Sequence, residues 1–193
     1  MRILLVHAHP VPASFSGSLY RLALEKLTAS GHEVITADLY KEGFDPVLSR
    51  QERENYHETD INRLPVEDHV ERLLTADALV LVYPVWNYGF PAIMKGWFDR
   101  VFLPGVSFDM VDGKVRTNLG NITKLIVLTS YGGTRFKSFL AGDPPRKIVM
   151  RMLRATINPR AKVRYLAHYD MNRSTEHTRD AFMDRAAKLL ETV

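Results

Sequence analysis

The feature that most constrains the fold is an unbroken apolar run, Ala78 to Tyr83, followed by an aromatic turn and an apolar helix pattern. Such a run is typical of a strand buried on both faces. It ends before Pro84, because proline cannot donate to a strand ladder and keeps the preceding residue extended. Pro91 then fixes φ for a first helical turn, and apolar residues recur at helical spacing to Val101. The aromatic turn therefore occupies the carboxyl end of a core strand, where open α/β sheets bind ligands, unless it is a hydrophobic plug between loops.

The same strand-then-helix order recurs along the chain. Strands are expected at 2–7, 33–38, 78–83, 124–130 and 163–168, and helices at 19–27, 65–76, 91–101, 144–156 and 175–192. The connections 40–64 and 103–121 show no sustained periodicity: the first is expected to cross the surface with short helical pieces, and the second to be irregular. Five alternations predict a single α/β domain, residues 1–193, with helices on both faces of a five-stranded parallel sheet. Because no G-x-G-x-x-G follows the first strand, the flavodoxin-like strand order 2-1-3-4-5 is favoured over the dinucleotide-binding order.

Composition narrows the classes of function. Hydrophobic residues make up 46% and charged residues 25% of the 193 positions, which is typical of a globular protein in water. The net charge of +4 suits an anionic cofactor, but it is too small and too dispersed to indicate a nucleic-acid partner. The lack of cysteine excludes disulfides, thiolate metal sites and a cysteine nucleophile. No segment approaches the ~18 apolar residues of a membrane span, and no signal peptide is recognisable, so we expect a cytoplasmic protein.

The carboxyl ends of the first, third and fourth strands are expected to meet at one edge of the sheet. Each is followed by a loop whose residues could bind a ligand. In the first loop, Ser14, Ser16 and Ser18 stand just before the expected helix. Hydroxyl and free N–H groups in that place form a phosphate cradle. His9 stands beside them and can donate a hydrogen bond or carry charge. A helix N-cap with spare serines is the structural alternative.

The other two loops suit a flat ligand. Trp86, Asn87 and Tyr88 form an aromatic wall after the third strand. Gly132 and Gly133, after the fourth, allow a close approach to the backbone, although a tight turn also explains them. A flat, phosphorylated, electron-accepting ligand uses all three loops. A flavin fits: its phosphate takes the first loop, its ring lies on the aromatic wall, and N–H groups near the glycines stabilise charge at the N1/O2 edge on reduction.

Competing chemistries lack their residues. A phosphoacceptor receiver domain shares the topology but needs carboxylates at the ends of the first and third strands, where this chain has His7 to His9 and Tyr83-Pro84. Neither G-x-S-x-G nor G-x-x-x-x-G-K-[ST] is present. His7 and His9 share a face and could hold a metal ion, but no third ligand follows at a convincing spacing, so no metal site is expected.

Three segments resemble the NAD(P)H:quinone oxidoreductase family, whose members are flavodoxin-like enzymes related to flavin reductases that accompany some bacterial potassium-efflux systems. They read HAHPVPASFSGSL, DLYKEGFDPVLS and YPVWNYGFPAIMKGWFDRVFLPG. The similarity runs from residue 1 to about Gly133 and is most specific from Pro84 through Phe102. It implies FAD or FMN as a non-covalent cofactor, and hydride transfer from NAD(P)H through flavin N5 to a quinone or similar small acceptor. The alternative is a flavin-binding regulatory subunit of a membrane potassium-efflux transporter, with secondary reductase activity.

Carried over by position, the resemblance implies three groups of cofactor-binding residues. These are His9, Ser14, Phe15 and Ser16 at the phosphate; Pro84, Val85, Trp86, Asn87 and Tyr88 beside the ring; and Ser130, Tyr131, Gly132 and Gly133 at its other edge. The family is generally dimeric, with the active site at the subunit interface, so the resemblance also implies a homodimer. The apolar bulk here is more than one small helix needs, which agrees with that expectation; it comprises Trp97, Phe98, Phe102, Phe108 and Met110.

Two departures from the family pattern bear on the chemistry. Quinone reductases of the family often place a Tyr and a His a few residues beyond the double glycine, where they are thought to assist protonation. Here the corresponding segments, 135–138 and 142–145, contain neither. Tyr131, Arg135 or a water molecule could supply the proton instead, and Tyr131 is our candidate catalytic residue. The family also commonly has an aromatic residue at the position of Asn87, so the aromatic wall is shifted by one residue to Trp86. The choices between FMN and FAD, and between NADH and NADPH, stay open.

Overall fold

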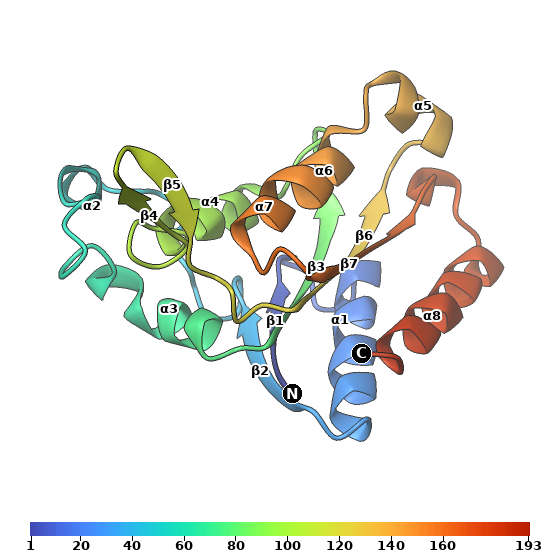
Figure 1. Ribbon diagram of the computed structural model, residues 1–193. Helices are drawn as coiled ribbons and strands as arrows, with labels where there is room; N and C mark the ends of the chain where they lie inside the picture. The colour runs from blue at the N-terminus through green and yellow to red at the C-terminus, as the bar shows by residue number, and fades with distance from the viewer.

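The computed structural model describes residues 1–193 and is built on a five-stranded parallel sheet (Figure 1). In sheet order the strands are β2 (Glu33–Asp38), β1 (Arg2–His7), β3 (Ala78–Val85), β6 (Lys124–Tyr131) and β7 (Lys162–His168). Counted among the strands of this sheet alone, the order is 2-1-3-4-5, so the predicted topology is confirmed. The central strand β3 pairs with β1 and β6 and is buried at every position before Val85, as its unbroken apolar run predicts.

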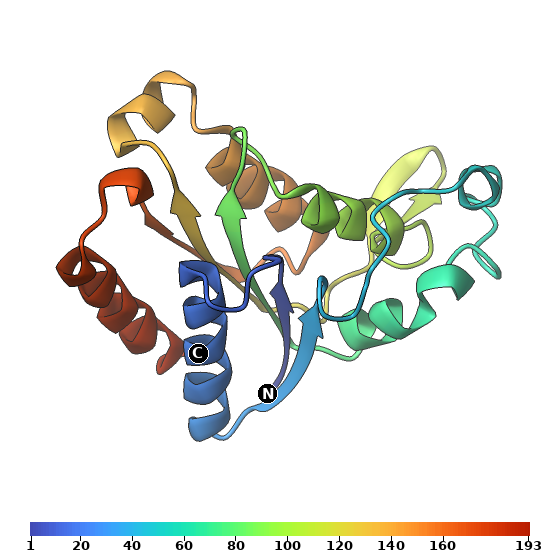
Figure 2. The same cartoon turned by 180° about the vertical axis from the view of Figure 1, so that it is seen from behind.

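Helices cover both faces of the sheet, as the two opposite views show (Figures 1 and 2). On one face, α1 (Phe15–Ala29) and α8 (Glu176–Leu190) pack over residues such as Leu5 and Val80. On the other, α3 (Glu67–Leu74) and α4 (Ala92–Val101) pack over residues such as Leu81, together with a helical segment at 144–156. Successive residues of a strand point to opposite faces, so each buried strand contributes to both cores. The flavodoxin-like α/β class is therefore confirmed.

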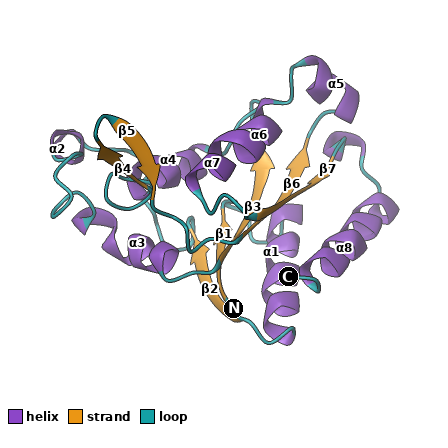
Figure 3. Cartoon of the chain, in the orientation of Figure 1, coloured by secondary structure: helices purple, strands orange, loops and turns teal.

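The connections contain short elements (Figure 3). Helix α2 (Arg50–Glu54) is a short helical piece of the kind expected at 40–64, and η1 (Leu64–Val66) leads into the helix expected at 65–76. The sequence periodicity does not indicate the other elements, which are β4 (Phe108–Val111), β5 (Lys114–Thr117), α5 (Arg135–Leu140) and η3 (Met171–Arg173). The prediction of an irregular connection at 103–121 is wrong in its middle, because β4 and β5 pair as an antiparallel hairpin. Its turn is Asp112-Gly113, both at positive φ, and that dipeptide is a strong local hairpin signal.

Two helices differ in detail from the prediction. The segment at 144–156 is helical throughout, but it divides into α6 (Pro144–Lys147), a π-helical stretch η2 (Ile148–Leu153) and α7 (Arg154–Thr156). Helix α1 begins at Phe15, earlier than the predicted Leu19, because the Ser14 hydroxyl accepts a hydrogen bond from the N–H of Gly17 at 3.1 Å. Ser14 is thus the N-cap, and Ser16 lies in the first turn.

The apolar residues of α4 are used within the chain itself. Trp97 is fully buried and Phe98 is 8% exposed, so they do not form the free surface that the sequence argument for a dimer assumed. The long connection at 40–64 packs against the same helix. A Cβ atom at Gly96 would lie 2.2 Å from the carbonyl oxygen of Pro46, and Arg100 forms an ion pair with Glu52 at 2.6 Å. None of the helices combines the length and the apolarity needed to cross a membrane.

Candidate functional site

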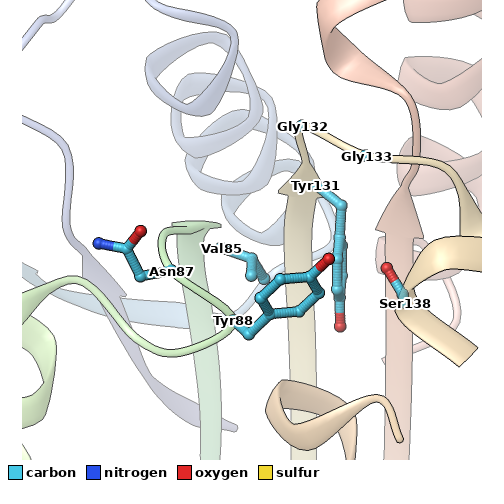
Figure 4. Close-up of a pocket in the computed structure, with 7 residues that line it drawn as sticks. All are labelled: Val85, Asn87, Tyr88, Tyr131, Gly132, Gly133 and Ser138. Carbon is cyan, nitrogen blue, oxygen red and sulfur yellow. The ribbon is translucent and has the colours of Figure 1, made fainter. Parts of the chain in front are cut away.

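Two adjoining pockets lie at the carboxyl edge of the sheet, and both are lined by Val85 and Gly132. The larger, of about 310 Å³, is lined by His9, Ser14, Phe15, Ser16, Pro84, Val85, Trp86, Ser130, Gly132, Met171 and Asn172. The smaller, of about 230 Å³, is lined by Val85, Asn87, Tyr88, Tyr131, Gly132, Gly133 and Ser138 (Figure 4). Each residue that the sequence assigns to the cofactor lines one of the two pockets, so the structure brings the whole set together.

The first loop ends in an arrangement that suits an anion. The N–H groups of Phe15 and Ser16, in the first turn of α1, have no acceptor within the protein. The N–H of Val11 donates to Nδ1 of His9 at 3.0 Å, which leaves Nε2 of that imidazole to donate. Free N–H groups and the positive end of the helix dipole favour a phosphate. Ser14 therefore caps the helix, as the structural alternative predicts, while donors beside it stay free, and a phosphate at those donors stays a prediction.

The second loop is a tight hairpin turn from Trp86 to Gly89. The N–H of Trp86 donates to the carbonyl of Gly89 at 3.2 Å, and the N–H of Gly89 donates back at 2.9 Å. Asn87 and Tyr88, between them, adopt φ of 47° and 56°, a region that glycine and asparagine occupy far more readily than tyrosine. Strain of this kind is common where a side chain must be presented to a ligand.

The wall of the site comes from two residues of that turn. Trp86 is 40% exposed and Tyr88 is 49% exposed, so both rings can contact a ligand. Figure 4 shows the ring of Tyr88 beside that of Tyr131, with the side chain of Asn87 pointing away from them. On the other side of the turn, the Trp86 ring lies 5.8 Å from that of His9. The wall is thus formed by Trp86 and Tyr88, whereas the side chain of Asn87, which also lines the smaller pocket, points away from the Tyr88 ring.

The third loop presents free donors. The N–H groups of Gly132 and Gly133 have no acceptor within the protein, whereas their carbonyls accept from the N–H groups of Asn172 and Asp170. A Cβ atom at Gly132 would lie 3.3 Å from Oδ1 of Asn172, and one at Gly133 would meet nothing within 4 Å. The segment after β7 therefore holds the glycine loop from behind, while the N–H groups stay available to a ligand.

Sequence reasoning missed three lining residues: Ser138, Met171 and Asn172. Met171 and Asn172 follow the fifth strand of the sheet. Because the carboxyl ends of all parallel strands share one edge, the segment after His168 could have been included from topology alone. Ser138 lies on α5, in a region without a helical pattern long enough to predict.

The candidate catalytic residue, Tyr131, is held by a chain of hydroxyl contacts. Its Oη lies 2.9 Å from Oδ1 of Asp143 and 2.6 Å from Oη of Tyr165. An ionised carboxylate only accepts hydrogen bonds, so Tyr131 donates to Asp143 and accepts from Tyr165. Burial raises the pKa of the Tyr131 phenol, and Tyr165 and Asp143 raise it further, so it stays protonated at physiological pH. Arg135, the alternative proton donor, is exposed and lines neither pocket.

These features agree with what the chain resembles. The flavodoxin-like fold family matches residues 1–192, so the chain belongs to that family, and the match extends well beyond Gly133, where the resemblance was expected to fade. A human relative named ribosyldihydronicotinamide dehydrogenase (quinone) is 34% identical over 151 residues, which cover 69% of this chain and 64% of that protein. An uncharacterised NAD(P)H oxidoreductase of Haemophilus influenzae is 35% identical over 115 residues, or 59% of this chain and 56% of that one.

Among solved structures, the NAD(P)H:quinone oxidoreductase of Methanothermobacter marburgensis superposes with a TM-score of 0.86 at 28% identity, covering 99% of this chain and 98% of that chain. The resemblance to quinone oxidoreductases that the sequence motifs indicate is thereby confirmed. The chain spans between 45% and 64% of the length of the curated relatives that it matches.

Proposed function

We propose that this chain is a cytoplasmic, flavin-dependent NAD(P)H oxidoreductase that passes two electrons to a quinone or a similar small acceptor. The observation that carries the proposal is the convergence of two sets of free backbone N–H groups and an exposed aromatic wall on adjoining pockets. The names of the relatives support the same reaction class. They do not favour the alternative of a transporter's regulatory subunit.

The residues present fit a flavin, either FMN or FAD. The N–H groups of Phe15 and Ser16 would hold its phosphate, with Nε2 of His9 as a further donor. Trp86 and Tyr88 would contact its ring. The N–H groups of Gly132 and Gly133 would face its N1/O2 edge, where a donor stabilises negative charge. When bound, the flavin supplies the hydride chemistry at N5, and the protein orients and tunes it.

Tyr131 is the proposed proton carrier at the ring edge. Its phenol releases a proton only as another arrives, because its raised pKa makes a lasting phenolate unfavourable. Asp143 and Tyr165 are in contact with Oη and can pass that proton. We expect Tyr131→Phe to keep flavin affinity while lowering steady-state turnover by roughly 10²-fold, the usual scale of general acid catalysis. The matched control is Tyr56→Phe, which lies outside both pockets. Equal turnover in the two variants would remove Tyr131 from the chemistry.

The proposed function is tested by anaerobic spectroscopy of the purified protein after incubation with FMN or FAD. We expect a yellow complex that NADH or NADPH bleaches and that a quinone then recolours. Free flavin at the same concentration is the control for uncatalysed reduction. A protein that retains neither flavin would contradict the proposal as a whole. A complex that is bleached but not reoxidised by quinones would contradict only the acceptor class.

A homodimer also belongs to the proposal. Of the apolar residues that the sequence suggested for it, Met110 is 58% exposed whereas Trp97 is buried, and a further exposed apolar surface lies on α5. Phe136, Phe139 and Leu140 on α5 are 67%, 73% and 68% exposed, on the same short helix that brings Ser138 to the smaller pocket. Exposed apolar residues gathered in this way are typical of a contact surface. Sedimentation of the purified protein should give a dimer, and a monomer at assay concentrations would contradict it.

A further inference from the structure

A polar trio, of which His7 and Ser16 are buried and Asp38 is partly exposed, lies beneath the start of α1. Nε2 of His7 is 3.4 Å from the hydroxyl of Ser16, and its Nδ1 is 3.3 Å from a carboxylate oxygen of Asp38. His7 is 2% exposed and Ser16 is 4% exposed. Both distances are slightly longer than typical hydrogen bonds, and Nδ1 makes no well-aligned one. Ser16 also lines the larger pocket, so the trio connects that pocket with the interior.

The trio interrupts an otherwise apolar layer. Strand alternation places His7 on the same face of β1 as Ile3 and Leu5, which pack in the core beneath α1. The ring of Tyr20, on α1, stacks on the imidazole with centroids 4.6 Å apart. A buried polar ring is costly unless its nitrogens have partners. The chain provides one on each side, because Asp38 is the register partner of His7 on β2 and Ser16 is on the helix above.

The protonation state of His7 decides which way the Ser16 hydroxyl points. In the neutral imidazole, the nearby Asp38 carboxylate favours the proton on Nδ1, so Nε2 is an acceptor and Ser16 donates to it. A hydroxyl has a single proton, so Ser16 then presents only lone pairs to the pocket. In the imidazolium, Nε2 donates to the Ser16 oxygen, and the hydroxyl proton is free to point at an anion.

We propose that His7 and Asp38 set the direction of the Ser16 hydroxyl, so that binding a phosphate-bearing flavin at the start of α1 is coupled to the uptake of one proton by His7. The proposal rests on the proposed function for the nature of the ligand. It makes His7 a positioning residue that acts through Ser16 and does not itself touch the phosphate.

The charges around His7 give the sign of the effect. Burial lowers the pKa of His7, Asp38 acts against that shift, and His9 and Arg21 add to it; Tyr20 faces the ring as a neutral phenol. The free protein therefore holds His7 neutral above its ordinary pKa of about 6.5. The negative charge of a bound phosphate raises the pKa of His7. At pH values between the pKa of His7 in the free protein and its pKa in the complex, flavin binding takes up a proton. Flavin affinity therefore falls as pH rises, by at most tenfold per pH unit.

The test is titration of flavin fluorescence with the purified protein, from about pH 5.5 to about pH 8.5, to compare wild type with His7→Gln. FAD is the main probe, because its diphosphate stays fully ionised over this range. Riboflavin, which has no phosphate, is the ligand control. We expect wild type to bind FAD more weakly as pH rises. His7→Gln can donate to Ser16 at every pH and should lose the slope, and riboflavin should show none.

His9→Gln is the matched control variant, since it alters the other histidine of the site. It should bind FAD more weakly at every pH but keep the slope. Ser16→Ala removes the hydroxyl and keeps the His7 imidazole, so it should also lose the slope even if His7→Gln does not fold. Nitrogen-15 spectra give an independent readout: His7 should change from the neutral Nδ1–H form to the imidazolium when FAD is added near pH 7.

The outcomes separate the two proposals. If wild type and Ser16→Ala bind FAD with the same slope, or if the slope disappears only in His9→Gln, the coupling through His7 is overturned while the flavin site stands. A neutral His7 in the FAD complex would also overturn it. If wild type binds neither FAD nor FMN at any pH, the proposed function fails, and this inference fails with it.

Discussion

Two aromatic pairs on either side of Pro91 are in opposite physical states. Trp86 and Tyr88, before it, are 40% and 49% exposed in a turn whose central residues have positive φ. Trp97 and Phe98, after it, are 0% and 8% exposed inside a helix. Each pair consists of a tryptophan and a second aromatic residue, so the difference comes mainly from the backbone that carries them. Helical periodicity directs side chains to a core, whereas a turn at a strand end presents them to whatever binds there.

The two regions also differ in whether their polar groups have hydrogen-bond partners and in whether their backbone is strained. The Trp97 indole N–H lies 3.4 Å from Nδ1 of His69, and its ring packs on Phe98 and Phe102. Around the turn, Gly132 and Gly133 leave their N–H groups without acceptors, and Tyr88 holds a strained backbone. Unpaired donors and strain beside exposed rings are typical of a binding site and rare in a core. The first region should therefore control stability and the second affinity.

The largest expected effect is on stability, from Trp97→Ala. Removing a fully buried indole should lower the free energy of unfolding by about 3–5 kcal/mol, measured by urea denaturation. Trp86→Ala is the matched control, and it should change the same quantity by less than about 1 kcal/mol because its ring is exposed. Comparable losses of unfolding free energy in the two variants would show that the turn is part of the core, which would contradict the distinction between the two regions.

The next effect is on affinity. The double variant Trp86→Ala/Tyr88→Ala should weaken flavin binding by about tenfold or more, since each aromatic contact is worth about 0.5–1.5 kcal/mol beyond its burial. Fluorescence titration measures the affinity, and urea denaturation should show little change in the free energy of unfolding. If flavin affinity is intact in this variant, the turn is only a hydrophobic plug between loops.

The smallest effect isolates the strain at position 88. Tyr88→Gly and Tyr88→Ala both remove the ring, but only glycine relieves the positive φ. We expect the glycine variant to have a free energy of unfolding higher than the alanine variant by up to about 1 kcal/mol, while both bind flavin equally weakly. A glycine variant no more stable than the alanine variant would mean that the turn stores no strain.

Much of the fold was predictable because its signals are local and periodic. The unbroken run at 78–83 indicates a doubly buried strand, and repeated strand–helix alternation restricts the topology to a few arrangements. What was missed depends on single residues. The start of α1 depends on the Ser14 cap, and the β4–β5 hairpin depends on Asp112-Gly113, which periodicity does not register. The π-helical stretch at 148–153 has no pattern that periodicity can reveal.

The site, too, has a part that could be predicted from the sequence and a part that could not. Residues on the loops after β1, β3 and β6 could be assembled from sequence, because parallel strands bring their carboxyl ends to one edge. Contacts between segments that are distant in the sequence could not be predicted in this way. Tyr131 and Tyr165 are 34 residues apart yet share a hydrogen bond. Asp143 and Asn172 likewise reach the site only through tertiary packing. His7, considered from sequence only as a metal ligand, is beside Asp38 because of strand register.

The central claim is that one edge of the sheet is a flavin site with three distinct parts. A crystal structure of the protein grown with FMN tests it most directly. We predict the phosphate at the N–H groups of Phe15 and Ser16, and the ring between the Trp86–Tyr88 wall and the N–H groups of Gly132 and Gly133. A flavin bound elsewhere, such as the basic pocket of Lys124, Lys162 and Arg164, would contradict the account. So would a phosphate and ring with exchanged positions.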